Sequence, residues 1–227
     1  MAIRFIGDEG YMKQVSDGIW KDGSRLYTKN LKPGKRVYDE RLVNHENMEL
    51  REWNPSRSKL GAAIANGMKS VPLAENSRVL YLGASTGTTV SHVSDICENG
   101  FVYALEFAER VFRSLMELAE QRKNIAPLMA DARKPENYSW IEECDIVFID
   151  AAQPDETEIA IRNAETFLKS GGFLLIAVKS QSIDVTKRPE EVYEQEAGKL
   201  VRAGYEVLEI INLEPHEEKH CLIVARK

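Results

Sequence analysis

The sequence predicts an α/β protein with a doubly wound, mostly parallel sheet of seven strands and a small N-terminal antiparallel β domain. From about residue 78 onwards, short apolar runs alternate with segments whose apolar residues recur at helical spacing. The last two expected strands, 205–213 and 219–226, are joined by a connection too short for a parallel crossover, so the last strand must run antiparallel. The first residues contain only short β segments and turns. We therefore expect two domains, residues 1–54 and 55–227.

Composition limits the class of protein. A chain of 227 residues with 43% hydrophobic residues can bury a full core. The longest apolar runs, such as Phe173–Val178, are too short to span a bilayer. The start of the chain, Met1–Arg4 with the charged residues after it, lacks the pattern of a signal peptide. The three cysteines, Cys97, Cys144 and Cys221, lack metal-ligand or redox spacing, so we expect packing roles and a reducing cytoplasm.

The charge of the chain is acidic overall but unevenly distributed. A net charge of −6 does not suit a protein that binds nucleic acid unaided. Residues 1–58 carry 11 Lys and Arg against 9 Asp and Glu, whereas the remaining residues carry 19 against 27. The basic excess lies between Lys21 and Arg41. This segment is either a phosphate-facing patch or scattered solvated charge. Its basic residues are Lys21, Arg25, Lys29, Lys32, Lys35, Arg36 and Arg41.

Turn signals organise the N-terminal part. The Asp-Gly pair within Lys21–Gly23 predicts a β-hairpin between strands near 18–20 and 24–28. A second turn is expected at Leu31–Lys35, followed by Val37-Tyr38. Asn54-Pro55 predicts the start of a helix near Ser56, with Leu60, Ile64 and Met68 on one face.

In the main domain the expected strands end at one edge of the sheet. Ligands of doubly wound sheets bind beyond the carboxyl ends of the strands. Here those ends are Gly83, Glu106, Asp131, Asp150 and Lys179, and four of the five are charged, which predicts a functional site. The expected strands are 78–83, 101–106, 125–130, 145–150 and 172–179, and the expected helices are 87–98, 108–122, 155–169 and 189–203.

The first strand of this domain leads into a glycine turn. The pattern of Val79–Val90 predicts strand, tight turn and helix, with Gly83 and Gly87 able to adopt positive φ and with Thr88 and Thr89 at the helix start. The spacing is G-x-x-x-G, which is neither the dinucleotide fingerprint nor a P-loop. Glu106, at the end of the next strand, is placed to accept both hydroxyls of a ribose. This combination favours S-adenosylmethionine over NAD; the alternative is a turn that only joins strand and helix.

Several longer blocks of the sequence resemble the fibrillarin family of RNA-guided ribose 2′-O-methyltransferases, over nearly the whole chain. The absence of a Gly/Arg-rich N-terminal tail is typical of the archaeal form. Ser56 and His216 depart from the family pattern, which usually has Phe and Tyr there. The matching blocks are Leu26–Leu31, Trp53–Leu60, Tyr81–Thr89, Asp131–Arg133, Asp150–Asp155 and Glu214-Pro215.

The resemblance implies a class I S-adenosylmethionine-dependent methyltransferase fold and a set of cofactor contacts. Glu106 would bind the ribose, Phe107 would lie against the adenine, and Asp131 would accept a hydrogen bond from the exocyclic amine. The alternative for Phe107 is a core aromatic at the head of a helix. The implied contacts are Gly83, Thr88, Thr89, Glu106, Phe107, Asp131, Ala132, Asp150, Ala151, Ala152 and Gln153.

The family's catalytic tetrad corresponds to Lys59, Asp150, Lys179 and His220. A ribose 2′-hydroxyl is a poor nucleophile, and neighbouring lysines depress each other's pKa, which can make one of them a base. Our hypothesis is that Lys179 is the base, that Lys59 lowers its pKa and stabilises the nascent alkoxide, that Asp150 offsets charge, and that His220 orients the acceptor. The structural alternatives are that Lys59 is a solvated helix lysine, that Lys179 is a strand terminator and that His220 is a hydrogen-bonded strand histidine.

The resemblance also implies partners: guide RNA, a target that is rRNA with tRNA as a further candidate, a Nop-family scaffold protein and a kink-turn-binding protein of a box C/D ribonucleoprotein. No metal and no membrane are expected. Two alternatives stay open at this point. One is a small-molecule methyltransferase, which needs a closed acceptor pocket and no basic surface. The other is a non-catalytic assembly subunit, which has no use for Lys59 and Lys179.

Overall fold

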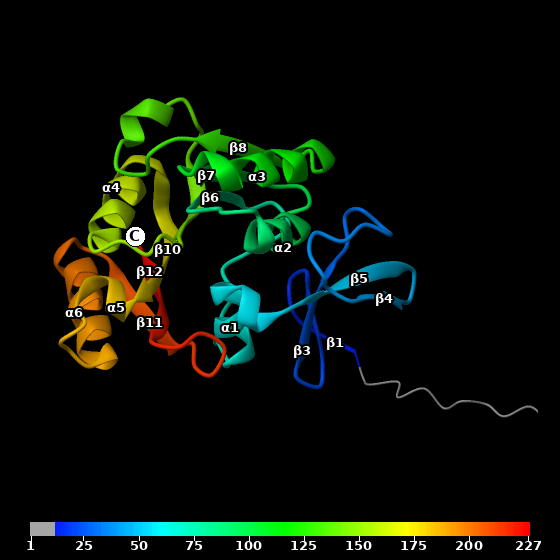
Figure 1. Ribbon diagram of the computed structural model, residues 1–227, viewed down its shortest axis with the longest axis horizontal. Coiled ribbons are helices and arrows are strands. Elements are labelled where there is room, and N and C mark those ends of the chain that lie inside the picture. Colours follow the sequence, from blue (N-terminus) through cyan, green and yellow to red (C-terminus); the bar gives the residue numbers. More distant parts are fainter. Residues whose placement is uncertain (1–11) are drawn as a thin grey trace, which may run out of the picture.

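A computed structural model describes residues 12–227, so the expectation for Met1–Arg4 lies outside the described residues. The chain forms two sheets (Figure 1), one of five strands and one of seven. The helix α1 (Lys59–Ala65) lies between them. Within residues 12–227, no helix combines the length and the apolar character that crossing a membrane requires. Cys97, Cys144 and Cys221 are all buried and unpaired, as expected for packing roles.

The small sheet is antiparallel with the order β1-β2-β3-β5-β4. The expected hairpin is confirmed: Asp22 pairs with Arg25, and Gly23 has a φ of +57°. A second hairpin joins β4 and β5 through Glu46-Asn47 and carries no glycine signal, although Glu46 has a φ of +53°. The strands are β1 (Lys13–Ser16), β2 (Ile19–Asp22), β3 (Arg25–Lys29), β4 (Leu42–His45) and β5 (Met48–Trp53).

The large sheet has the order β11-β12-β10-β9-β6-β7-β8. As expected, the last strand is antiparallel, but it lies inside the sheet between β10 and β11 rather than at its edge. The strands are β6 (Arg78–Leu82), β7 (Phe101–Glu106), β8 (Ile125–Met129), β9 (Cys144–Ile149), β10 (Leu168–Lys179), β11 (Glu206–Asn212) and β12 (His220–Arg226). The helices that follow α1 are α2 (Thr88–Ile96), α3 (Glu109–Gln121), α4 (Glu156–Phe167), α5 (Ser180–Ile183) and α6 (Pro189–Arg202).

Three of the expected boundaries are wrong. The strand expected at 172–179 begins at Leu168, whose extended backbone (φ −85°, ψ 125°) ends α4 and cuts short the helix expected to run to 169. The helix expected near Ser56 is split in two. A short 3₁₀ helix, η1 (Pro55–Arg57), is followed by Ser58 in an extended conformation. Its hydroxyl accepts a hydrogen bond from the amide of Gly61, which makes it the N-cap of α1.

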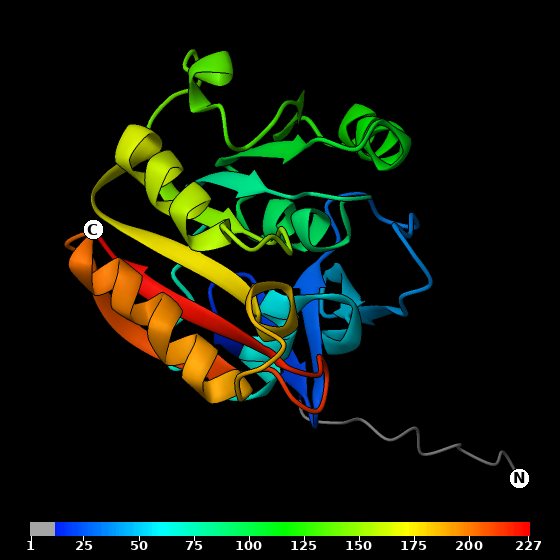
Figure 2. The same ribbon diagram turned by 60° about the vertical axis from the view of Figure 1, so that its left-hand side comes forward.

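Side-chain alternation divides the core into one cluster on each face of the large sheet. Val79, Tyr81 and Phe148 pack toward α1, α2 and the small sheet. Leu80, Leu82 and Ile149 pack toward α4 and α6, which lie in front of the sheet in Figure 2. Between β8 and β9, a second 3₁₀ helix, η2 (Pro135–Tyr138), contributes Tyr138 to this second cluster.

A buried network of charges joins the small sheet to the helices α2 and α3 of the main domain. Arg51 of β5 contacts Glu40 and Asp95 at 2.5 Å each, and the three side chains are fully buried. Asp95, on α2, also accepts a hydrogen bond from Arg122 at 2.6 Å and one from Thr28 at 3.0 Å. The small sheet is thus tied to α2 and to the end of α3, and a division of the chain at residue 54 stays a prediction.

The network generates a stability prediction. Asp95→Ala leaves the buried guanidinium of Arg122 without a carboxylate and removes one of the two carboxylates that contact Arg51, so we expect the free energy of unfolding to fall by about 3–5 kcal/mol. The control is Glu98→Ala, which breaks the half-exposed pair with Lys29 and is expected to cost about 1 kcal/mol or less. Urea unfolding of both variants measures the difference. Equal losses would contradict a special role for the buried network.

Candidate active site

The four residues of the expected tetrad gather at one edge and on one face of the large sheet. Phe148 and Ala177 belong to the core cluster on the face that packs against α1. Asp150 and Lys179 each lie two positions further along the same chain direction, just after β9 and at the end of β10. Because side chains two positions apart point to the same face, Asp150 and Lys179 share this face. His220 lies directly opposite Lys179 in the antiparallel pair of β10 and β12. Lys59 is the first residue of α1. The structure therefore brings together residues from four separate elements.

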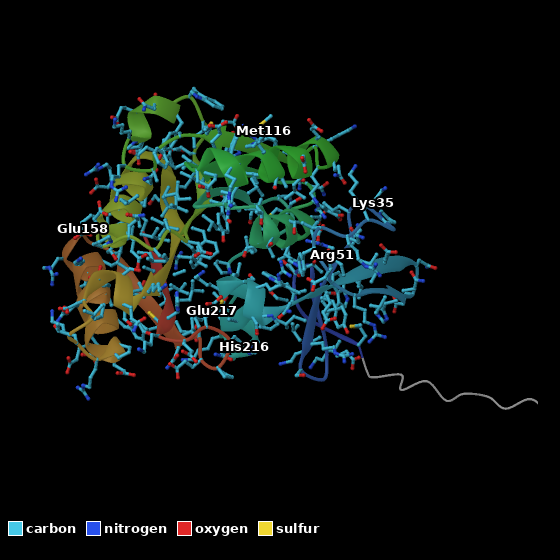
Figure 3. All side chains as sticks on the ribbon, viewed as in Figure 1. Lys35, Arg51, Met116, Glu158, His216 and Glu217 are labelled. Atoms are coloured by element: carbon cyan, nitrogen blue, oxygen red, sulfur yellow. The ribbon has the colours of Figure 1, made fainter. Side chains whose placement is uncertain are left out.

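Lys59 and Asp150 form an ion pair. The Lys59 Nζ lies 2.9 Å from Asp150 Oδ1, and the two side chains are only 22% and 18% exposed. Burial acts to lower the pKa of Lys59, but the charge of Asp150 and the hydrogen bond to it, with a smaller effect of Glu217, raise this pKa above its ordinary value. Figure 3 shows Glu217 and His216 in the loop beside α1. Lys59 is thus positively charged. The negative charge of Asp150 offsets this charge and weakens the electrostatic effect of Lys59 on Lys179.

Hydrogen bonds hold Asp150 and His220 in place. The Tyr81 hydroxyl donates to Asp150 Oδ2 at 3.3 Å. His220 is 7% exposed, and its Nδ1 lies 2.7 Å from the Glu218 carbonyl oxygen. Because a carbonyl only accepts, Nδ1 carries a proton, and in the neutral ring Nε2 is left as an acceptor.

The glycine turn lets the ends of two strands touch. Gly83 has a φ of +85°, and a Cβ there would lie 2.4 Å from the Asp150 carbonyl oxygen. Gly87 (φ +90°) is the N-cap of α2 and provides no side-chain cap. The first-turn amides at Thr88 and Thr89 are thus not capped by the N-cap residue and face the turn. The Thr89 hydroxyl itself donates to Ser58 Oγ at 3.0 Å, which links the first turns of α1 and α2.

The carboxylate of Glu106 is oriented by backbone amides. Its Oε2 accepts from Ser85 N and its Oε1 from Ala108 N, at 2.7 Å each. Each oxygen retains a lone pair for a further donor. Next to it, the Phe107 side chain is 71% exposed, so the core-aromatic alternative for this residue is wrong. Asp131 follows β8 by two positions, and its Oδ1 accepts from the amide of Arg133 at 2.9 Å.

The loops after β8 and β9 are joined by Arg133, which is not among the predicted site residues. Arg133 donates to Asp155 at 2.7 Å and to Gln153 Oε1 at 3.1 Å. This ties the loop containing Ala132 to the loop 151–153, in which Ala151 is half-buried while Ala152 and Gln153 are exposed. The motif Asp131–Arg133 is the only sequence signal that points to it.

Glu156 is a second residue that sequence reasoning misses. Its side chain is fully buried at the start of α4, and neither carboxyl oxygen has a hydrogen-bond partner of normal geometry among the described residues. Burial raises the pKa of Glu156 to about 9, although the backbone amide of Lys179 acts to lower it. At neutral pH it is therefore an uncharged acid next to the end of β10. An acidic residue in the first turn of a helix is common, so the sequence contains no signal that Glu156 is buried and uncharged.

The edge fits S-adenosylmethionine. A ribose needs acceptors for two hydroxyls, which the oriented Glu106 carboxylate provides. An adenine needs an apolar surface and an acceptor, which the exposed Phe107 ring and Asp131 provide. No group of His, Cys, Asp and Glu in residues 12–227 is arranged to hold a metal ion. The fold and this edge together define a class I S-adenosylmethionine-dependent methyltransferase.

Comparison with known proteins narrows this class. The family model for fibrillarin matches residues 11–227. The chain is 46% identical over 226 residues to the fibrillarin-like rRNA/tRNA 2′-O-methyltransferase of Methanococcus maripaludis, with 99% of this chain and 96% of that protein covered. The chain belongs to the fibrillarin family.

Two solved structures have the same fold at substantial identity. One is Aeropyrum pernix fibrillarin in complex with natively bound S-adenosyl-L-methionine, with a TM-score of 0.85 and 42% identity, covering 94% of this chain and 98% of that one. The other is a fibrillarin/Nop5p complex, with a TM-score of 0.86 and 39% identity, covering 94% and 99%. These matches confirm the family and the fold that the sequence resemblance implies.

The contact between Gly83 and Asp150 generates the next prediction. Gly83→Ala and Gly67→Ala both place a Cβ at positive φ, +85° and +91°, but only the first meets an atom within 4 Å. We expect Gly67→Ala to cost about 1–2 kcal/mol of the free energy of unfolding. Gly83→Ala is expected to cost about 1–3 kcal/mol more because the strand ends must separate.

Thermal and urea unfolding measure the stability of the two glycine variants, and calorimetry measures their affinity for S-adenosylmethionine. Only Gly83→Ala is expected to weaken cofactor binding. Equal stability and equal affinity in the two variants would show that the close contact is not a constraint on the site.

Proposed function

We propose that this protein transfers a methyl group from S-adenosylmethionine to the ribose 2′-hydroxyl of guide-selected nucleotides in rRNA, with tRNA as a further candidate target. The observation that carries the proposal is the Lys59–Asp150 pair, set 2.9 Å apart on the same face and edge as Lys179 and His220. The name of the Methanococcus maripaludis relative supports the reaction, and the ligand bound to Aeropyrum pernix fibrillarin supports the cofactor.

The cofactor supplies an electrophilic methyl group, and the chain binds and orients it. Glu106 accepts from the two ribose hydroxyls with an orientation already set by the amides of Ser85 and Ala108. Phe107 covers one face of the adenine, and Asp131 accepts from its amine. The remaining proposed contacts come from the glycine turn and from the loops after β8 and β9. They are Gly83, Thr88, Thr89, Ala132, Asp150, Ala151, Ala152 and Gln153.

The chain's residues also act on the acceptor. Lys179 Nζ takes the proton of the 2′-hydroxyl in this proposal, and His220 Nε2 orients the hydroxyl or a neighbouring phosphate. The charged Lys59, held by Asp150, stabilises the developing negative charge on the oxygen. In-line displacement requires close alignment of the reacting groups, and the shared face of four elements provides a rigid frame for it.

Partners supply the RNA in this proposal. The net charge of −6 gives the chain little general attraction for a polyanion. The fibrillarin/Nop5p complex supports a Nop-family scaffold as a partner. We further propose guide RNA and a kink-turn-binding protein as the other components of a box C/D ribonucleoprotein, and a location in the cytoplasm, where the three free thiols stay reduced. Methylation of a guide-paired RNA by the reconstituted complex, and its absence without guide RNA, tests the whole proposal.

The role of Glu106 predicts a loss of cofactor affinity. Glu106→Ala removes a charge-assisted acceptor of two hydroxyls and is expected to weaken S-adenosylmethionine binding by about 1–3 kcal/mol. The matched control is Glu109→Ala, a neighbouring exposed carboxylate that pairs with Arg113 on the helix surface and is expected to leave affinity unchanged. Isothermal calorimetry of both variants decides. An unchanged affinity in Glu106→Ala would remove this carboxylate from the cofactor site.

The role of Lys179 predicts a loss of rate. Lys179→Ala is expected to lower single-turnover methylation in the assembled complex by about 10²–10⁴-fold with cofactor affinity nearly unchanged. Lys179→Arg is expected to be almost as damaging, since a guanidinium stays protonated and cannot accept the proton. Lys187→Ala, an exposed lysine paired with Asp184, is the control. An active arginine variant would instead assign Lys179 the role of a positive charge near a phosphate.

A further inference from the structure

A polar hollow of about 450 Å³ lies on the small domain, and none of its lining residues belongs to the tetrad. It is formed by the loop between β3 and β4 together with the end of β5. In Figure 3 Lys35, on this loop, lies above the buried Arg51. The lining residues are Arg36, Tyr38, Asp39, Glu40, Arg41, Glu52 and Asn54.

The loop is held rigidly although it contains no regular secondary structure. Buried Glu40 accepts hydrogen bonds from the amides of Val37 and Tyr38 at 2.9 and 2.8 Å, and from Arg51 at 2.5 Å. Burial acts to raise the pKa of Glu40, but these amides and the Arg51 charge lower it, so the carboxylate is charged and locked. The carbonyl of Arg41 accepts from the amide of Glu52 at 2.8 Å, which fixes the end of the loop to β5.

The charges around the hollow do not cancel. The carboxylate of Glu40 is matched by Arg51, and that of Asp39 by Arg57 at 2.5 Å. Glu52 has Arg25 at 3.8 Å. Arg36 and Arg41 are exposed, and neither has an ion-pair partner within residues 12–227. The hollow therefore presents two uncompensated guanidinium groups on a preformed loop.

An aromatic side chain and a free amide add to these charges. The guanidinium carbon of Arg57 lies 4.9 Å from the centroid of the Tyr38 ring, a stacked arrangement that holds Arg57 at the rim. The Asn54 side chain uses its oxygen to cap η1, accepting from Ser56 N at 2.9 Å. Its amide NH₂ is left as a donor directed by a fixed side chain. Guanidinium forks and side-chain amide donors are groups that bind phosphodiester backbones.

The hollow is close to the acceptor side of the candidate active site. Asn54 lines it, and Lys59 follows five residues later through η1 and Ser58. Five residues span at most about 18 Å. A stacked strand rises about 3.4 Å per nucleotide, so the hollow lies within about five nucleotides of a ribose placed at Lys59.

We propose that Arg36 and Arg41 bind two phosphates of the target RNA strand beside the methylated nucleotide, with Asn54 and Arg57 at the rim of the same site. The inference rests on the proposed function and deepens it, because it names the surface that receives the flank of the substrate. Such a site adds affinity and register and contributes no sequence preference, which leaves the choice of nucleotide to base pairing with the guide.

The test measures target-RNA binding by the assembled complex over a range of salt concentrations. For single-stranded RNA each phosphate contact contributes about 0.7 to the slope of log K against log salt, so the Arg36→Ala/Arg41→Ala double variant is expected to lower the slope by about 1.4. The Arg36→Lys/Arg41→Lys variant keeps the charges and is expected to keep most of the slope. The control is Arg202→Ala/Lys123→Ala, two exposed basic residues far along the chain from this loop.

The outcomes are distinct. An unchanged slope in the alanine variant, or an equal loss in the control, overturns the proposal. Loss of scaffold-protein binding with an unchanged RNA slope also overturns it and assigns the hollow to a protein contact. Because binding is measured without methyl transfer, these results are separate from the test of the proposed function, which fails if the wild-type complex transfers no methyl group or transfers it without guide RNA.

Discussion

The buried charges around Arg51 are the constraint on which the rest of the structure depends. Arg51 on β5 and Asp95 on α2 are fully buried and meet at 2.5 Å, so the small sheet cannot shift on the large one without exposing or separating them. Two segments of the active site leave this contact directly. The end of β5 leads through η1 to Lys59, and the other end of α2 begins at the glycine turn. One network thus sets the position of a proposed catalytic lysine and of the proposed cofactor loop.

A second contact couples those two segments to the sheet. The Asp150 carboxylate binds Lys59, while its backbone carbonyl lies where a side chain at residue 83 would be. The residue that holds the lysine is therefore also the residue against which the glycine turn packs. Asp150 thus contacts both the proposed cofactor turn and the proposed catalytic lysine, beside the hydrogen bond from Thr89 to Ser58 that links the same two segments.

Much of the fold could be predicted because apolar periodicity reports which face of an element is buried. The strand and helix series, the antiparallel last strand and the Asp22-Gly23 hairpin all follow from local patterns. The missed features depend on contacts between distant residues. The β4–β5 hairpin turns at Glu46 without a glycine, and the end of α4 at Leu168 is set by sheet pairing. Glu156 resembles any first-turn acid until the sheet, α6 and β10 close around it.

In the proposed function an acidic chain acts on RNA. The arrangement of its basic side chains, some paired with carboxylates and some unpaired, explains how this is possible. Several basic side chains near the site are already paired: Lys59 with Asp150, Arg57 with Asp39, and Arg133 with Asp155. These pairs orient groups but add little long-range attraction, because the field of each cation is cancelled at a short distance. In the proposed function, long-range capture of RNA therefore comes from partner molecules. What the chain retains for RNA are short-range groups that act only after the strand has been delivered to the edge of the sheet.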